Sequence, residues 1–271
     1  MGQDSSKEQA DETNRIIKLG MTIGAVLCLL AGLAMGAMAL AGPIAVWLGA
    51  ADFRMGFGLL QIVNAWSPWI AGITMALAAG IFMLGMVREI EGAPRLATFA
   101  FLGAFAAGLA WLIPASFRPP EGTPVIHDVA TDPDNPLSYI AIAPLRADAP
   151  NNMDYGVMRN RDITVEQHRK EQREAYPDIV PQRFDAPVGE VFGRALSAAR
   201  RLGWEIVDQD PDSGRIEATD TTFWFRFKDD VVIQVTSEGS GSVLNARSLS
   251  RVGTSDVGKN AARLREFFAL L

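Results

Sequence analysis

The distribution of charged side chains limits what this chain can fold into more than any other feature. Residues 19–114 contain only six charged side chains, whereas the rest of the chain is rich in charge and proline. A single water-soluble domain spreads its apolar residues more evenly. The mean hydropathy of +0.13 is therefore an average over an apolar region and a polar region. The pattern predicts a membrane block joined to a water-exposed block. The six residues are Asp52, Arg54, Arg88, Glu89, Glu91 and Arg95.

Three apolar runs in this block are long enough to cross a membrane as helices. They cover residues 19–42, about 66–87, and 96–114. At 1.5 Å per residue the first run spans about 34 Å, which exceeds the thickness of the hydrocarbon core. Pro43 and Pro114 stand where two of the helices are expected to end, because proline interrupts helix propagation. Residues 19–114 are therefore predicted to form a three-helix transmembrane domain.

Two further features of this domain predict contacts. The apolar first loop, residues 43–65, is expected to lie in the outer interface as a short helix or re-entrant turn, either as a plain connector or as a lipid or partner contact. The first run carries glycine pairs spaced by four residues, which let helix backbones approach closely. Packing within the bundle is the expected use, with self-association as the alternative. The pairs are Gly20 with Gly24 and Gly32 with Gly36.

Basic residues in the short loops predict the orientation of the helices. The N-terminal tail has three, the first loop one and the second loop two, so residues 1–18 are predicted to be a cytoplasmic tail. The chain beyond residue 115 is then periplasmic, and the protein is placed in a bacterial inner (plasma) membrane. Four tryptophans fall at the helix ends predicted to be external, which agrees: Trp47, Trp66, Trp69 and Trp111. A cleaved signal peptide is the less favoured alternative, because the first run is long for one and the tail carries four acidic residues.

Proline dominates the start of the water-exposed block. Residues 114–187 hold 11 of the 15 prolines, and residues 115–187 are predicted to form an ordered but irregular arm. Thr164 and Gln167 are spaced as a capping box, and Pro177 follows, which predicts a short exposed helix between them.

Residues 188–271 alternate between helical and strand patterns. Apolar spacing predicts a helix over 188–202 and a closing helix over 257–271, with short strands and turns between them. Tight turns imply an antiparallel sheet, so the predicted fold is a two-layer α+β domain whose sheet is covered by two helices. The strands are expected at 204–207, 215–220, 223–227, 231–235 and 243–249, with turns at 208–214, 229–230 and 238–241.

Several segments of the water-exposed block resemble the DUF1499 family, a family of unknown function. They are Ile126–Val129, Ala175–Ile179, Gly214–Ala218, Phe227–Val231 and the tail Arg247–Arg263. The resemblance covers roughly residues 118–271. It implies a membrane-associated or exported protein and supplies no catalytic residues. The cysteine-containing stretch that often opens the shorter family form is absent here.

The segment from Arg247 to Asn260 is the sharpest candidate site. A strand is expected to end near Ser250 and a helix to begin near Asp256, so helix N–H groups and two arginines could hold an anionic group. The alternative is structural: Ser255 or Asp256 caps the helix and an arginine pairs with Asp256. The candidate ligand-binding residues are Arg247, Ser250, Arg251, Gly253, Ser255, Asp256 and Asn260.

Other sequence patterns give weaker indications of a functional site. The aspartates at 208, 210 and 212 lack the glycine and carboxylate positions of a calcium loop. His127 beside Asp128 is poorly placed for a catalytic pair, since neighbouring residues rarely give that geometry. One cysteine and two histidines leave little metal chemistry, and the net charge of −6 argues against nucleic-acid binding. We predict no catalytic residues, no metal site and no cofactor.

The sequence thus predicts a non-enzymatic binding or accessory module for an envelope component, held on a bilayer by three helices. Its partners would be the lipid bilayer and an envelope lipid or protein, with no nucleic acid. Two alternatives stay open. One is an enzyme acting on an envelope lipid or glycan through Arg247, Arg251 and Asp256, and the other is a structural subunit of a membrane complex.

Overall fold

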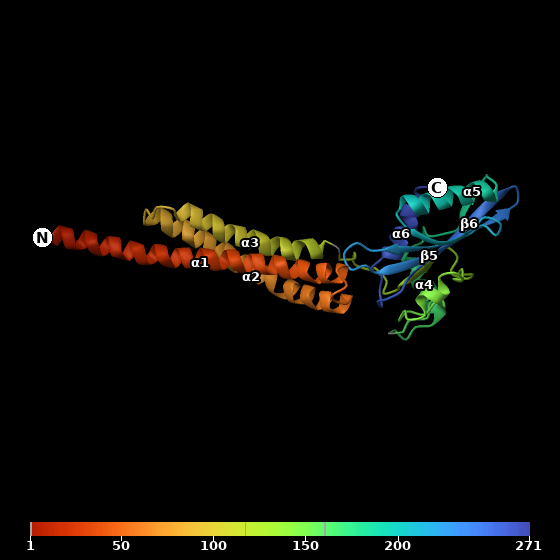
Figure 1. Ribbon diagram of the computed structural model, residues 1–271, viewed down its shortest axis with the longest axis horizontal. Coiled ribbons are helices and arrows are strands. Elements are labelled where there is room, and N and C mark those ends of the chain that lie inside the picture. The colour runs from red at the N-terminus through yellow and green to blue at the C-terminus, as the bar shows by residue number, and fades with distance from the viewer. Residues whose placement is uncertain (1, 117, 160) are drawn as a thin grey trace. The chain divides into compact units, whose positions relative to one another are not determined.

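The computed structural model describes residues 2–116, 118–159 and 161–271 and divides into two compact units (Figure 1). The first unit is Met1–Arg118 and the second is Pro119–Leu271.

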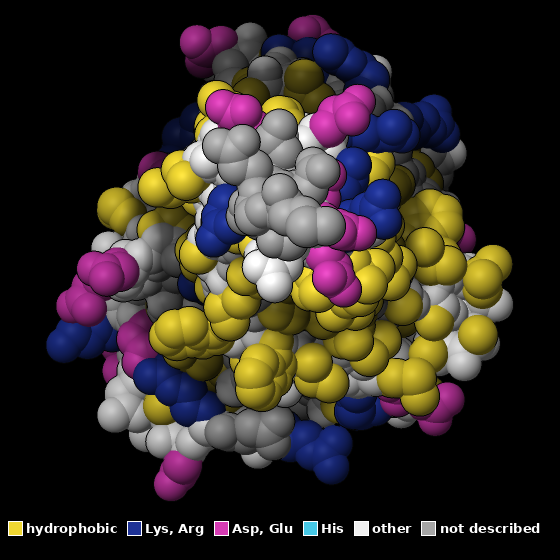
Figure 2. All heavy atoms as spheres, turned by 90° about the vertical axis from the view of Figure 1, so that its left-hand side faces the viewer, with side chains coloured by type: hydrophobic (Ala, Val, Ile, Leu, Met, Phe, Trp, Pro, Cys, Tyr) yellow, Lys and Arg dark blue, Asp and Glu magenta, His cyan; other side chains and the backbone are white. Residues whose placement is uncertain are grey.

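The first unit is a bundle of three helices, α1 (Gly2–Trp47), α2 (Phe53–Val87) and α3 (Ala93–Ala115). Each contains a stretch that is long and apolar enough to cross a membrane. Large apolar side chains on their outer faces are exposed, among them Leu27 and Trp69, and Figure 2 shows hydrophobic side chains over a broad area of the face it presents. Such a surface indicates association with a lipid bilayer.

The helix limits differ from the sequence prediction at the first loop. Pro43 lies inside α1 rather than at its end, and Pro68 lies inside α2. Membrane helices tolerate proline because neighbouring groups satisfy the freed backbone. The expected loop 43–65 shrinks to the few residues before Phe53, where the Asp52 carboxylate accepts a hydrogen bond from the N–H of Met55 at 3.1 Å. Most of the apolar residues in this segment therefore belong to α1 and α2 and not to an interfacial turn.

Glycine allows α1 and α3 to touch through their backbones. A Cβ atom on Gly103 would overlap the carbonyl oxygen of Cys28, and one on Gly32 would overlap the backbone of Gly103. Gly32 therefore serves packing within the bundle, as expected. The other three glycines of the two spaced pairs have open space at the Cβ position: Gly20, Gly24 and Gly36.

Replacing Gly103 by alanine is expected to destabilise the bundle by about 1–3 kcal/mol, because the new methyl group has no room against α1. Gly108→Ala is the matched control in the same helix, since nothing lies within 4 Å of its Cβ position. Thermal unfolding of both variants in detergent makes the comparison. Equal melting temperatures for the two variants would contradict the close contact.

The second unit contains six strands and three α-helices among its described residues. The helices are α4 (Val165–Ala175), α5 (Val188–Arg201) and α6 (Lys259–Phe268), and a short 3₁₀ helix, η1 (Ala143–Arg146), precedes them. The strands are β1 (Asp128–Ala130), β2 (Gln182–Phe184), β3 (Glu205–Asp210), β4 (Arg215–Thr221), β5 (Lys228–Glu238) and β6 (Gly241–Ser250).

The strands form one antiparallel sheet of the predicted kind. Its order is β1-β6-β5-β4-β3. Strand β2 pairs with the same edge of β6 as β1, but closer to the start of β6. Helices α5 and α6 cover one face over a core that includes Ile216, Ile233, Leu244 and Phe267, as Figure 1 shows. The predicted sheet with two covering helices is thus confirmed.

The proline-rich arm covers the other face of the sheet and adds two strands to it. Tyr139 and Ile142 of the arm pack on Val232 and Leu249 in a second apolar cluster. The predicted capping box of α4 is present in both halves. Gln172, on the buried side of that helix, donates to the carbonyl of Ala130 and accepts from its N–H. This side chain satisfies the outer edge of β1 in place of another strand.

Three sequence predictions in the sheet are wrong, and one is the start of the turn at 208–214, because β3 continues through Asp210. Phe223–Phe227 forms turns between β4 and β5 rather than a strand. Asp229 and Asp230, predicted as a turn, lie inside β5 and are buried. Their charge predicts exposure to solvent, but each carboxylate pairs with an arginine inside the protein.

Candidate functional site

Arg247 lies at the centre of the arm-facing side of the sheet and is 2% exposed. Its Nε and one terminal nitrogen donate to the two carboxylate oxygens of Asp128 at 2.9 and 2.8 Å. The guanidinium also donates to the carbonyls of Leu137 and Met153 in the arm. The rings of Tyr139 and Tyr155 lie 5.1 and 5.5 Å from it, at cation–π distance. Every nitrogen of this guanidinium therefore has a partner within the protein.

Asp230 is the second centre on the same face and is fully buried. Its carboxylate accepts from Arg146 at 2.7 Å and from two nitrogens of Arg251 at 2.8 Å each, while the hydroxyl of Thr219 donates at 2.7 Å. Arg146 comes from η1, so this shared carboxylate joins the arm to three strand regions. Charge-assisted, bidentate bonds of this kind are the stronger ones.

The opposite face, under α6, has a matching polar cluster. Arg263 donates to Asp229 at 2.5 Å and to Asp220 at 2.8 Å. Asn260 beside it donates to the carbonyl of His127 and to the hydroxyl of Ser250, and its carbonyl oxygen accepts from Ser248 and Arg263. These bonds tie the first turns of α6 to β5 and β6.

The loop from β6 to α6 is shaped by its backbone and by one carboxylate. Gly253 and Gly258 have positive φ angles of 93° and 83°, and Val257 has a φ of 51°, which is strained for a β-branched residue. The carboxylate of Asp256 accepts from the N–H groups of Gly258 and Asn260, both at 2.8 Å. The Asp256 carboxylate therefore binds N–H groups at the start of α6, as predicted, but the residue at the N-cap position is Gly258 and the helix begins at Lys259.

The arginine partner predicted for that cap is wrong. Neither arginine of the candidate segment pairs with Asp256, because Arg247 binds Asp128 and Arg251 binds Asp230. Arg247 and Arg251 point to the arm side of the sheet, whereas Ser250 and Asn260 bond to each other on the α6 side. The hydroxyl of Ser255 accepts from the N–H of Val257 within the loop. Ligand binding at these residues stays a prediction, and the structure gives their polar groups partners inside the protein.

The sequence does not predict several residues of this polar cluster. The sequence pattern marks Asp128 only as a neighbour of His127 and indicates no role for Arg146 or Arg263. The signal that could have found them is an imbalance: arginines in apolar strand and helix patterns require buried carboxylates. The buried acids that meet this need are Asp128, Glu217, Asp229 and Asp230.

The side chains of His127 and Asp128 have different partners in the structure. The Asp128 carboxylate is taken by Arg247, and the Nδ1 atom of His127 lies 3.4 Å from the carbonyl oxygen of Thr254. Burial lowers the pKa of His127 from its ordinary value, which keeps the ring neutral. The pair holds chain segments together in this structure.

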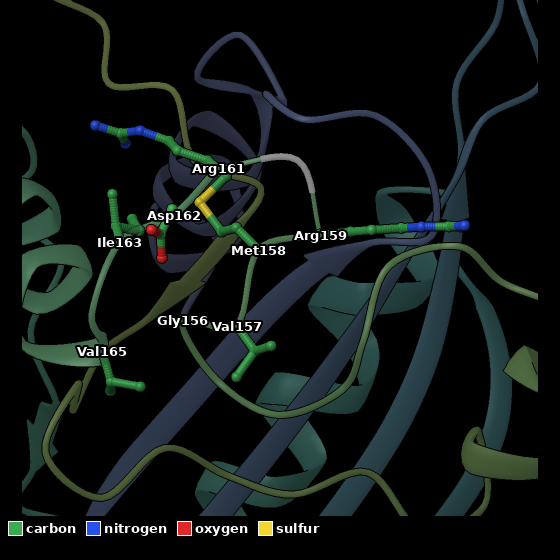
Figure 3. Close-up of a pocket in the computed structure, with 8 residues that line it drawn as sticks. All are labelled: Gly156, Val157, Met158, Arg159, Arg161, Asp162, Ile163 and Val165. Atoms are coloured by element: carbon green, nitrogen blue, oxygen red, sulfur yellow. The ribbon is translucent and has the colours of Figure 1, made fainter.

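An open depression of about 460 Å³ lies in the segment that leads into α4. Arg159 and Arg161 line it, but in Figure 3 their side chains extend away from each other. Arg161 is also held by Glu171 through two hydrogen bonds. The depression does not include any residue of the candidate segment. Among the described residues, no group of three or more His, Cys, Asp or Glu side chains could hold a metal ion.

The buried polar cluster lies within a region that matches a known protein family. The model of a protein family of unknown function, DUF1499, matches residues 128–271, more than half of the chain. The chain belongs to the DUF1499 family. None of the curated proteins compared with it matches.

The DUF1499 match begins at Asp128, the partner of Arg247, and runs through α6. It therefore contains both partners of each buried ion pair described above, and it includes the arm from β1 onward. The three apolar helices lie outside it and fit a membrane-anchored form of the family. The arm and the sheet together, rather than the sheet alone, make up the DUF1499 unit.

Replacing Asp256 by asparagine is expected to flatten the stability of the DUF1499 unit between about pH 4 and 6. Burial raises the pKa of Asp256 from 3.8 to about 6. The folded state therefore keeps a proton that the unfolded chain releases. Asp256 contributes stability that is fully present below pH 3.8 and is lost as the pH rises through about 6. Asparagine keeps a capping oxygen but does not titrate.

Denaturation of the full-length protein in detergent at several pH values, followed by amide exchange in β5 and β6, measures this difference. Asp178→Asn is the control, because hydrogen bonds from Arg265 lower the pKa of Asp178 and move its effect to more acidic pH. An unchanged pH dependence in Asp256→Asn would show that this carboxyl does not titrate in the window.

Proposed function

We propose that this protein is a multi-pass protein of a bacterial inner (plasma) membrane whose DUF1499 unit is a non-enzymatic binding or accessory module for an envelope component. In this proposal the N-terminus is cytoplasmic and the DUF1499 unit is periplasmic. The lipid bilayer is one partner, and an envelope lipid or protein is the other.

The observation that supports a binding module is that the charged side chains of the candidate segment are paired within the protein. Arg247 pairs with Asp128, and Arg251 and Arg146 both pair with Asp230, so these groups hold the arm on the sheet. A buried network of this kind favours one rigid arrangement of the unit and leaves these groups unavailable to a substrate. A rigid unit on a membrane anchor suits recognition.

The alternative, an enzyme for an envelope lipid or glycan, has less support. It needs Arg247, Arg251 and Asp256 to face a common pocket, whereas none of these three lines the depression before α4, which is formed by Gly156–Arg159, Arg161–Ile163 and Val165. Arg247 and Arg251 also bind separate carboxylates on the arm side of the sheet, whereas Asp256 binds N–H groups at the start of α6.

Reporter fusions test the orientation. Alkaline phosphatase fused after Leu271 is expected to be active and a green fluorescent protein at the same point dark, because the first folds outside the cytoplasm and the second inside. Fusions after Glu91, between α2 and α3, are the matched control and should give the opposite pattern. A fluorescent fusion at Leu271 would overturn the periplasmic assignment.

Purification of the full-length protein from native membranes tests the binding role. A lipid or protein is expected to be retained by the full chain and lost from a chain that ends at Arg118. Equal recovery from both chains, or nothing above background from the full chain, would contradict a binding module in the DUF1499 unit.

A further inference from the structure

The loop between β4 and β5 carries two large apolar side chains on the surface of the DUF1499 unit. Phe223 is 65% exposed and Trp224 is 39% exposed. Their rings meet edge to face, with centroids 5.2 Å apart. Single exposed apolar residues are common, but a pair of aromatic rings at one loop tip marks a contact surface.

Hydrogen bonds hold this loop in a fixed shape. The N–H of Thr222 donates to the carbonyl of Phe227, and the N–H of Phe227 donates to the hydroxyl of Thr222. The N–H of Arg226 donates to the carbonyl of Thr222, and the rings of Phe225 and Phe227 stack with centroids 5.9 Å apart. Because the loop is already ordered, presenting its rings to a partner costs little conformational entropy.

Two more exposed apolar residues lie at the same end of the sheet. The N–H of Arg251 donates to the carbonyl of Lys228, which places the loop after β6 beside the start of β5. In that loop Val257 is 43% exposed. The N–H of Asp256 donates to the carbonyl of Ile126, and the neighbouring Val125 is 45% exposed. Val125, Phe223, Trp224 and Val257 are named here the apolar end of the unit.

The apolar end is also where the chain arrives from the membrane helices. Helix α3 ends at Ala115, and Thr123 is already fixed to the unit, since its Cγ2 atom lies 3.6 Å from the Cβ position of Gly258. The chain from Ala115 to Thr123 spans at most about 30 Å even when fully extended. The chain that follows α3 therefore enters the unit beside its apolar end through a short connection.

We propose that the apolar end of the DUF1499 unit inserts into the headgroup region of the bilayer that α1, α2 and α3 cross. Tryptophan and phenylalanine favour this region. Lys228 and Lys259 are exposed and begin β5 and α6 at the same end, where their charges suit anionic headgroups. The proposal rests on association with a bilayer, but not on which side of the membrane the unit lies.

Lipid-dependent quenching of a fluorescent label tests the insertion in the full-length protein. The label is attached at Phe223→Cys in a Cys28→Ala background, and the protein is placed in nanodiscs of phosphatidylcholine and phosphatidylglycerol with spin-labelled lipid. Ser240→Cys is the matched control, because Ser240 is exposed in the turn between β5 and β6, at the far end of the same sheet. Quenching is expected to be at least about threefold stronger at position 223 than at 240.

Trp224→Cys provides a second labelled position that keeps Phe223, and it should show the same preference over Ser240. Equal quenching at all three positions would overturn the proposal. So would a label at 223 that is shielded from water but not quenched by lipid, since a protein partner or a second copy would then cover this end. The reporter fusions at Leu271 are read separately, so failure of the insertion and failure of the proposed orientation can be told apart.

Discussion

Replacing Asp230 by asparagine is expected to lower the free energy of unfolding of the DUF1499 unit by about 3–5 kcal/mol. The carboxylate is fully buried and is shared by Arg146 and Arg251, whose side chains are 1% and 15% exposed. Asparagine cannot neutralise two guanidinium groups, so one buried positive charge or both would be left uncompensated. Because native domains are stable by only about 5–15 kcal/mol, this loss would remove a large part of the stability of the unit.

Amide exchange in β4, β5 and β6 of the full-length protein in detergent measures this loss without depending on the membrane helices. Glu238→Gln is the matched control: it removes the carboxylate of an exposed pair with Arg183, at side-chain exposures of 48% and 66%. That change is expected to cost about 0–1 kcal/mol. Similar exchange rates in the two variants would mean that Asp230 is not the buried centre described here.

Local patterns in the sequence predict most of this fold. Helices α4 and α5 were predicted almost to their ends, since a capping box and a run of apolar residues at helical spacing depend only on near neighbours. The strands β4 and β6 followed from alternation in the same way. The three apolar helices were predicted from the absence of charge, although their limits were not.

The errors arise where distant parts of the chain decide the structure. Phe223–Phe227 alternates like a strand, but the chain turns there, with Thr222 bonded to Phe227 across the turn. Asp229 and Asp230 have the local character of a turn, and they continue β5 only because Arg263, Arg146 and Arg251 reach them from other elements. Sequence spacing contains no sign of which arginine meets which carboxylate.

The candidate site shows the same division. The Asp256 carboxylate binds N–H groups only two and four positions away, and the sequence predicts such bonds, although the N-cap position itself belongs to Gly258. The partner of Arg247 is Asp128, 119 positions earlier in the chain. Two arginines near a helix start resemble an anion site in sequence, and only the folded arm shows that their charges are matched by protein carboxylates.

Replacing Arg247 by methionine is expected to cost about 3–5 kcal/mol, comparable to the loss of Asp230. The change leaves the Asp128 carboxylate buried at 2% exposure without its bidentate partner. It also removes the donors to the carbonyls of Leu137 and Met153, so the arm loses three of its attachments to β6 at once.

A double-mutant cycle separates the charge from the packing. Asp128→Asn alone should be destabilising, because Arg247 then lacks a counter-charge among its partners. The combination Asp128→Asn with Arg247→Met should cost clearly less than the sum of the single changes, since no unpaired buried charge remains. Amide exchange in β1 and β6 provides the measurement. Additive losses would show that Arg247 stabilises the unit through its contacts with the arm carbonyls and tyrosine rings, and that its pairing with Asp128 contributes little.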